Sequence, residues 1–464
     1  MAARSLPAVA RRAKAGARLP AVRSQTTARD RHARAPFRAR LVFVAILAFV
    51  VLASRNADAE ILIRWDLASI PSPQALGIST IVVPAAQAQG IKEALAQGYR
   101  VYVEIDAAAA ASFAPIEGTA GVIVNGPIAS DVRERLAQRV TIVRAAENRG
   151  KWPHIRTNWV TLNKDVLQVT NRSSQPWLEN NAALIRIATA ASPPGAPPVL
   201  LTYAWQPVTV ADLDQGPRRE NYLVAIAEAG GFGADLLLPL HERFERDLMA
   251  GGPDARADWE AIRRFVDFYA WNVPAQHRPV ANVGVVTSDP MRSFEMLNLL
   301  VRHNLPFVTI VPAAVTAQTL AGLDLLVLLD EPTGGGRAAA AAFAKQGGVL
   351  VEAKGAPSDP NSFALEMRQR LGSERRVVDV WNGITVLVAP YSRPTSEDLV
   401  LTVVNYAAQP LPIQVRVRGT FSEVQYEAPG QPAVLLSFEV RNGGTEFVLP
   451  ALSVGGRVFL NRVP

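Results

Sequence analysis

Short apolar runs alternate with helix-length amphipathic stretches from residue 60 to about residue 272. The runs that predict strands are Ile61–Trp65, Ile78–Val83, Arg100–Ile105, Gly121–Asn125, Val140–Arg144, Val166–Thr170, Val199–Tyr203 and Ala234–Leu238. The stretches that predict helices include Gln87–Gln97, Asp131–Gln138, Leu178–Thr189, Glu220–Glu228 and Arg256–Tyr269. This alternation is typical of parallel strands joined by crossover helices.

Eight strands in about 210 residues favour a closed (β/α)8 TIM-like barrel over residues 60–272. The sixth run, Val166–Thr170, has the weakest pattern of the eight. An open doubly wound sheet is the alternative, but no glycine-rich phosphate turn follows the first strand.

Two further segments follow the barrel. Pro274 and Pro279 mark a linker. Over residues 278–392 the strand and helix patterns restart, which predicts a small flavodoxin-like α/β domain that includes a strand at Ile384–Val388. Over residues 395–464 the helix signals stop, and short runs between Pro and Gly turns predict an antiparallel β-sandwich. The expected fold class is therefore α/β, with a β-sandwich at its C-terminal end.

Residues 1–59 have the pattern of an export signal. A basic stretch precedes Leu41–Ala53, an uncharged apolar run of 13 residues that is too short to span a bilayer. Small residues Ala57 and Ala59 then form an A-x-A cleavage pattern. We expect a periplasmic or secreted protein cleaved near Ala59, with an uncleaved membrane anchor as the alternative.

The net charge of +7 comes from this leader. From Glu60 onward there are 36 basic and 39 acidic residues, so the sequence does not indicate a nucleic-acid partner. The chain has no cysteine, and its five histidines are scattered without metal-site spacing. We therefore expect no metal and no cofactor.

The order of the three segments resembles bacterial β-galactosidases of the large barrel-glycosidase clan. The amidotransferase-like domain of those enzymes has sequence motifs similar to Leu323–Leu328 and Gln346–Val351. Their terminal β-domain has motifs similar to Leu401–Tyr406 and Phe447–Pro450. The resemblance implies a carbohydrate partner and homo-oligomer contacts through the second domain. Without cysteine, that domain cannot perform amidotransferase chemistry.

The catalytic glutamates of that clan are not matched. The resemblance implies a Glu after the Asn that ends strand four, but Gly126 follows Asn125 here. It also implies a Glu at the end of strand seven, where this chain has Tyr203-Ala204-Trp205. Neither catalytic role is therefore assigned by the resemblance.

The period of two in Arg100–Asp106 places Glu104 and Asp106 on the face that should point into the barrel. The same reasoning points Arg64 and Asp66 inward, so Arg64 and Glu104 should pair, either as a buried structural ion pair or as part of a site. Asp66 and Asp106 lie nearer the expected mouth at the C-terminal strand ends and should meet a ligand there.

Loops after the predicted strands are rich in indole rings and hydrogen-bonding groups. Sugars are bound by aromatic rings on their apolar face and by polar groups around their rim. The predicted substrate contacts in these loops are Trp152, His154, Asn158, Trp159, Trp177, Tyr203, Trp205 and His241. The alternative is that the loop tryptophans simply cap the barrel core.

Glycoside hydrolysis needs two carboxyl groups on either side of the scissile bond. Glu147 and Glu242 follow predicted strands and lie in polar loops, so they are the predicted catalytic pair. The sequence thus predicts an exported glycoside hydrolase that acts at the barrel mouth. The alternatives are a non-catalytic protein that binds carbohydrate or assembles with envelope proteins, and a purely structural oligomer.

Overall fold

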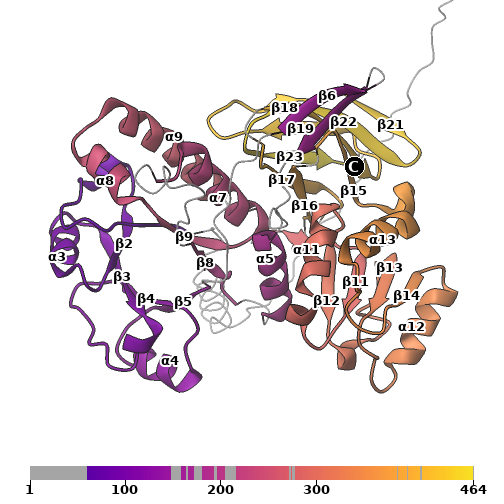
Figure 1. Ribbon diagram of the computed structural model, residues 1–464, viewed down its shortest axis with the longest axis horizontal. Coiled ribbons are helices and arrows are strands. Elements are labelled where there is room, and N and C mark those ends of the chain that lie inside the picture. Colours follow the sequence, from indigo (N-terminus) through magenta and orange to yellow (C-terminus); the bar gives the residue numbers. More distant parts are fainter. Residues whose placement is uncertain are drawn as a thin grey trace, which may run out of the picture. The chain divides into compact units, whose positions relative to one another are not determined.

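Parallel strands from the first half of the chain form a closed barrel in the computed structural model (Figure 1). The structure describes residues 60–147, 158–163, 166–171, 180–192, 196–203, 216–270, 273, 277–383, 385–393, 396–407 and 410–462. The barrel strands, in order around the ring, are β1 (Ile61–Arg64), β2 (Thr80–Pro84), β3 (Arg100–Asp106), β4 (Gly121–Asn125), β5 (Val143–Glu147), β8 (Leu200–Thr202) and β9 (Asp235–Pro239). The ring closes where β1 pairs with β9, with Leu62 beside Leu237.

The closed parallel barrel confirms the predicted fold class, but its strand count differs from the prediction. Seven strands form the ring among the described residues, because β5 pairs directly with β8. The sixth predicted strand is instead β7 (Val166–Asn171), which forms an antiparallel hairpin with β6 (Asn158–Asn163). A short apolar run has the same side-chain period in a hairpin as in a barrel, so the pattern could not separate the two.

One apolar layer fills the barrel interior. Each barrel strand contributes one side chain to it, namely Leu62, Val82, Tyr102, Ile123, Ala146, Leu200 and Leu237. Neighbouring residues such as Ile63, Val83 and Val103 belong to a second cluster that includes the surrounding helices. This alternation is expected of a barrel whose interior and exterior are both packed.

Helices connect the barrel strands. They are α2 (Pro73–Leu76), α3 (Ala88–Ala96), α4 (Ser130–Ala137), α5 (Asn180–Ala191), α7 (Arg219–Phe232), α8 (Glu242–Met249) and α9 (Pro253–Ala270), with a short 3₁₀ turn η1 (Ala107–Ala109). Helix α7 is buried along almost its whole length because it packs against β9, α9 and β17 (Leu399–Asn405). Gly230 permits this packing, since a Cβ there would lie 2.7 Å from the Cβ of Tyr269.

A charged network occupies the barrel at the N-terminal ends of its strands. Arg144 of β5 donates to Asp235 of β9 at 2.5 Å and to Glu60 at 3.1 Å. The backbone N–H of Glu60 also donates to Asp235, at 2.7 Å. Burial raises the pKa of Asp235, although Arg144 opposes that rise. Because this end lies away from the usual barrel mouth, the network serves stability.

The second segment contains a four-stranded parallel sheet. Its order is β12 (Phe307–Ile310), β11 (Val283–Val286), β13 (Leu325–Leu328) and β14 (Val349–Glu352). Its helices are α11 (Phe294–Arg302), α12 (Gly336–Lys345) and α13 (Pro360–Arg375), with 3₁₀ turns η2 (Pro290–Ser293) and η3 (Pro312–Ala314). Helix α12 packs beside β14, and α11 packs against α13 (Figure 1).

Two antiparallel sheets form the C-terminal part. One has the order β10 (Arg278–Pro279), β16 (Val386–Ser392), β17, β23 (Gly455–Asn461), β19 (Glu423–Glu427) and β20 (Val434–Leu435). The other has the order β15 (Val378–Trp381), β18 (Leu411–Arg418), β22 (Gly444–Leu452) and β21 (Phe438–Arg441). An apolar cluster that includes Val403, Val415 and Phe447 lies between them.

The antiparallel sheets take strands from residues that the sequence analysis assigned to the second segment. The run at Ile384–Val388 was expected in the parallel sheet, but β16 pairs antiparallel with β17. Strands β10 and β15 likewise pair with antiparallel neighbours. A fully apolar run is compatible with either sheet, so the pairing could not be predicted from composition.

Buried hydrogen bonds join the barrel helices to the antiparallel sheets. Tyr406, after β17, donates to Glu228 of α7 at 2.6 Å. Asn181 of α5 donates to the same carboxylate at 2.7 Å. Since a buried carboxylate is stable only with such partners, Glu228 fixes these elements relative to one another. No helix within the described residues is long and apolar enough to cross a membrane.

Candidate active site

Polar side chains replace the apolar layer at the C-terminal ends of the barrel strands. By the alternation of each strand, the inward positions beyond the apolar layer are the polar residues Arg64, Glu104, Asn125 and Thr202 and the prolines Pro84 and Pro239, with Asp66 and Asp106 at the rim. This is the end at which barrel enzymes place their active sites. The polar mouth is therefore the candidate site.

Arg64 joins two carboxylates in this mouth. Its Nε donates to Oε2 of Glu104, and its Nη1 donates to Oδ2 of Asp66. The first contact confirms the pairing that the period of two predicted. The Glu104 side chain is 8% exposed and the Asp66 side chain is 31% exposed. The pair therefore has one deep carboxylate and one that solvent or a ligand reaches.

The shared guanidinium limits how far apart the two carboxylates lie. Oxygens that accept from two nitrogens of one guanidinium are within about 9 Å of each other, because each hydrogen bond spans at most about 3.2 Å. Glycosidase carboxyl pairs are about 5–5.5 Å apart in retaining enzymes and about 6.5–9.5 Å apart in inverting enzymes. This upper limit on the separation of Asp66 and Glu104 is compatible with either arrangement.

The environment of Asp66 favours its protonated form. Burial raises the pKa of Asp66, the charge and hydrogen bond of Arg64 lower it, and the nearby charge of Glu242 raises it further, so that the net shift is upward. A carboxyl group with a raised pKa that is still accessible is suited to donate a proton.

Glu245 of α8 holds the main chain of Asp66 in place. Its carboxylate accepts from the N–H of Asp66 at 2.9 Å and from the N–H of Leu67 at 3.1 Å. The Glu245 side chain is fully buried, and burial raises its pKa to about 8, against the lowering effect of the Asp66 N–H. Glu245 therefore acts as a positioning residue for the loop that carries Asp66.

The raised pKa of Glu245 predicts a pH dependence of stability. Between about pH 5 and pH 8 the folded chain keeps a proton that the unfolded chain has lost, so the free energy of unfolding should fall as pH rises. Urea unfolding at several pH values across this window should show that the free energy of unfolding decreases less with pH for Glu245→Gln than for wild type. Glu242→Gln, on the exposed side of the same helix, should keep the wild-type slope. Equal slopes for wild type and Glu245→Gln would contradict this assignment.

His241 lies at the start of α8, as the sequence predicted for the end of the last barrel strand. Its Nδ1 accepts from the N–H of Arg243 at 3.3 Å, so the neutral ring carries its proton on Nε2. Its own N–H donates to the hydroxyl of Tyr222 at 3.0 Å. Gly216 packs on the ring, where a Cβ would lie 2.4 Å from Cγ of His241. The Arg243 N–H and Gly216 thus restrict the orientation of the ring.

Glu242, one of the two predicted catalytic carboxylates, lies in the first turn of α8. Its side chain is 60% exposed and accepts from Arg246 at 2.5 Å, one helical turn away. Its charge nevertheless acts on Asp66. The structure therefore brings Glu242 and Asp66 into one neighbourhood and leaves Glu242 at its solvent side.

Asn125 and Asp106 lie side by side at the strand ends, where β3 and β4 pair. Asp106 is exposed. The Oδ1 atom of Asn125 is buried and has no hydrogen-bond partner among the residues that the structure describes. A buried acceptor without a partner is costly unless a ligand or water completes it. Asn125 is thus a site residue that the sequence analysis noted without assigning a role.

Tyr203, one of the predicted substrate contacts, points away from the mouth. Tyr203 is buried outside the barrel interior, with its hydroxyl 3.5 Å from Glu228 of α7. The structure thus gives Tyr203 a packing role where the sequence predicted a substrate contact. Trp65 is also fully buried and donates to the carbonyl of Ser69 at 2.9 Å. Both follow inward-pointing residues by one position, and a shift of one residue reverses the face of a strand.

The remaining predicted contacts are beyond what the structure describes. Trp152, His154, Trp177 and Trp205 lie outside the described residues. Asn158 and Trp159 begin β6, and Glu147 ends β5, but their side chains are outside the described part of the chain. These assignments remain predictions.

The sequence analysis missed Glu245, although a signal for it exists. Phe244 and Leu248 flank it at helical spacing and place it on the buried face of α8. A carboxylate among apolar neighbours on a buried helix face needs hydrogen-bond donors. Here those donors are backbone N–H groups of the Asp66 loop, which no sequence pattern identifies.

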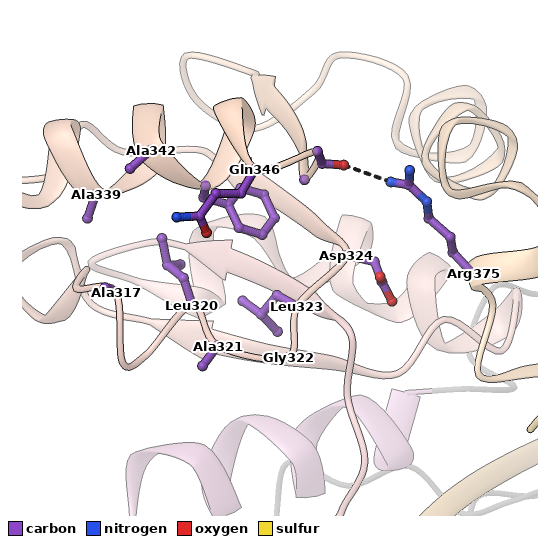
Figure 2. Close-up of a pocket in the computed structure, with 13 residues that line it drawn as sticks. Ala317, Leu320, Ala321, Gly322, Leu323, Asp324, Ala339, Ala342, Gln346 and Arg375 are labelled. Atoms are coloured by element: carbon purple, nitrogen blue, oxygen red, sulfur yellow. Dashed lines mark hydrogen bonds between the residues drawn. The ribbon is translucent and has the colours of Figure 1, made fainter.

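A hollow of about 520 Å³ lies away from the barrel, beside α12 (Figure 2). Small side chains such as Ala321, Ala339 and Ala342 form most of its wall. Its charged groups are already paired, since Arg375 donates to the carbonyl of Gly347 at 3.0 Å and Asp324 accepts from Arg418 at 2.6 Å. Over the described residues, no group of three or more His, Asp or Glu side chains could hold a metal ion.

Comparisons with known proteins give structural matches alone. No family model and no curated protein matches the sequence. The α-L-fucosidase isoenzyme 2 from Paenibacillus thiaminolyticus matches with a TM-score of 0.53 and 10% identity, over 88% of this chain and 100% of that chain. A GH42 beta-galactosidase from G. stearothermophilus matches with a TM-score of 0.39 and 12% identity, over 81% of this chain and 66% of that chain. A rhamnosidase from Novosphingobium sp. PP1Y matches with a TM-score of 0.39 and 9% identity, over 81% of this chain and 38% of that chain.

The fucosidase comparison identifies the fold, because it spans all of that enzyme and most of this chain. The resemblance to barrel glycosidases that the segment order predicted is confirmed at the level of the fold. The chain therefore has a glycosidase-like fold, a TIM-like barrel followed by antiparallel sheets.

Proposed function

We propose that this protein is a glycoside hydrolase that acts on a carbohydrate at the C-terminal mouth of the barrel. The observation that carries the proposal is the cluster of Asp66, Arg64 and Glu104, in which one guanidinium holds two carboxylates together at the mouth of a barrel whose fold matches a fucosidase. The unpartnered Oδ1 of Asn125 adds an acceptor for a sugar hydroxyl in the same mouth.

Asp66 is the proposed proton donor to the glycosidic oxygen. It is the accessible member of the pair, and burial shifts its pKa upward, the direction that suits a proton donor. Glu104 is the proposed second carboxylate, which Arg64 holds in one orientation. It would either attack the sugar carbon or take a proton from the attacking water, according to the exact separation.

The sequence-predicted pair, Glu147 and Glu242, is the competing assignment within the same proposal. Glu242 is exposed and paired with Arg246, yet it lies near enough to influence Asp66. Kinetics of Glu242→Gln and Glu147→Gln beside Asp66→Asn would show which carboxylates act. The assignment above expects the greatest loss for Asp66→Asn.

Turnover on a broad panel of aryl glycosides and oligosaccharides tests the proposed activity. Hydrolysis of at least one substrate, lost in Asp66→Asn with unchanged circular dichroism, would support it. No turnover on any substrate would contradict hydrolysis. The panel should include α- and β-linked neutral sugars, because the fold does not select among them.

Carbohydrate binding without turnover is the second candidate. The favouring observation is that Arg64 pairs with both of these carboxylates at once. A paired carboxylate is a weaker acid–base catalyst but still accepts hydrogen bonds from hydroxyl groups. Saturation-transfer NMR with sugars that are not hydrolysed would support this candidate if they bind wild type and not Asp66→Asn.

Export across the inner membrane belongs to the proposal. Its support is the basic stretch, the apolar run Leu41–Ala53 and the small residues Ala57 and Ala59. Expression of the full chain in a bacterial host, followed by intact-mass analysis, should give a product that begins at Glu60. A full-length product retained in the membrane would favour the uncleaved anchor.

A further inference from the structure

Strand β21 lies at one side of the four-stranded antiparallel sheet. Among the described residues it pairs with β22 and with no other strand. The connection to β22 is the two-residue turn Asn442-Gly443, whose φ angles of 48° and 69° are those of a tight hairpin turn. The edge of β21 therefore has a defined register and a side that no other described strand covers.

The turn fixes which backbone groups face away from β22. In a two-residue hairpin the residues that flank the turn, Arg441 and Gly444, exchange hydrogen bonds. Hydrogen-bonded pairs alternate along the strands, so Glu439 and Glu446 form the next one. The N–H and C=O of Val440 consequently point outward from the sheet edge, where they can pair with another strand.

Exposed apolar side chains gather around this edge. Eight large apolar residues are exposed within the described part of the chain, and four of them are Val434, Leu435, Val440 and Val448. Leu435 is 67% exposed. A hollow of about 710 Å³ runs between the segment before β21 and the outer face of β22. Such a local concentration of apolar surface marks an interaction site.

We propose that two copies of this chain associate through β21, antiparallel and about a two-fold axis at Val440. In this register Val440 pairs with Val440 of the partner subunit and exchanges both backbone hydrogen bonds with it. The two sheets then continue into one another across the axis, and the exposed Val440 side chains of the two copies become neighbours. The interface is isologous, as in most small homo-oligomers.

The charges on β21 select a second copy as the partner. Glu439 and Arg441 flank Val440, and their side chains are 66% and 64% exposed. The two-fold register puts Glu439 opposite the partner subunit's Arg441, and Arg441 opposite the partner subunit's Glu439. These are non-hydrogen-bonded positions, where facing side chains approach most closely. The salt bridge that now joins the two residues within one strand would be shared across the axis.

A charge swap tests this register. Sedimentation velocity of the purified full chain should show a concentration-dependent dimer. Glu439→Arg and Arg441→Glu should each weaken the dimer at least about tenfold, because like charges then face each other twice. The double variant Glu439→Arg/Arg441→Glu should restore it. Glu117→Arg, an exposed change on the barrel, controls for net charge. Residues 1–59 are identical in the wild type and all these variants, so association through them would not differ between the samples.

Cross-linking gives an independent test, because the natural chain has no cysteine. Val440→Cys places one thiol beside its own copy at a Cα separation of about 5.5 Å, which is within disulfide range. Oxidised glutathione should convert this variant to a covalent dimer and leave Glu117→Cys without a covalent cross-link. A wild-type monomer at every concentration, failure of the double variant to restore the dimer, or equal cross-linking of both cysteine variants would overturn the proposal.

Discussion

Asp66→Asn is expected to lower turnover of a glycoside substrate at least about a hundredfold, since a positioned general acid contributes about 10²–10⁴. Asparagine keeps the size of the side chain and can still contact Arg64 through its amide oxygen. It has no proton of suitable acidity to give to the leaving oxygen. The loss should therefore appear in kcat, with a smaller change in KM.

The pH profile gives a second readout of the same residue. Burial raises the pKa of Asp66, so the activity of wild type should persist to higher pH than an ordinary aspartic acid would allow. The matched control is Asp254→Asn, the same change at an exposed position in the first turn of α9. Its expected loss is less than about tenfold. Asp66→Asn activity within about threefold of wild type would remove Asp66 from the chemistry.

Arg144→Met is expected to lower the free energy of unfolding by about 3–5 kcal/mol, because it removes the cation from a buried charged network. The Asp235 side chain is 4% exposed and accepts from Arg144 at 2.5 Å. Methionine fills a similar volume but donates no hydrogen bond. Of the two donors to Asp235 described here, only the backbone N–H of Glu60 would then remain. Urea unfolding followed by circular dichroism would measure the loss.

Two further variants check the cause of that loss. The double variant Arg144→Met/Asp235→Asn also removes the buried carboxylate charge that Arg144→Met leaves without its cation. It should therefore recover part of the lost stability. Arg139→Met changes an exposed arginine and should stay within about 0.5 kcal/mol of wild type. A loss of less than about 1 kcal/mol for Arg144→Met would show that the network does not stabilise the barrel.

The period of two was enough to place the inward side chains of the barrel. It predicted that Arg64 and Glu104 share the interior, and the structure shows them hydrogen-bonded. This succeeded because a strand that is packed on both faces must alternate its side chains between them. The charged residues among the inward positions could therefore be identified from the sequence alone.

Strand partners were harder to predict than strands. The runs at Val166–Thr170 and Ile384–Val388 overlap strands β7 and β16, but each of these strands pairs in an antiparallel arrangement instead of the expected parallel one. Pairing depends on which distant segments come together, and the side-chain period of a single strand does not carry that information.

The tertiary contacts of the site were also beyond the sequence. Glu245 meets the Asp66 loop from a helix 179 residues later in the chain. Tyr203 is one residue out of phase with the inward positions, so its aromatic ring packs on α7 instead of the mouth. In both cases a residue type suited to a site was visible, but the direction of its side chain depended on packing.

A crystal structure of the protein soaked with the sugar that gives the strongest response in the panel tests the central claim most directly. The account predicts density for the sugar in the barrel mouth, with a hydroxyl on Oδ1 of Asn125 and the glycosidic oxygen within hydrogen-bond distance of Asp66. Sugar bound elsewhere, with the mouth left empty, would contradict it.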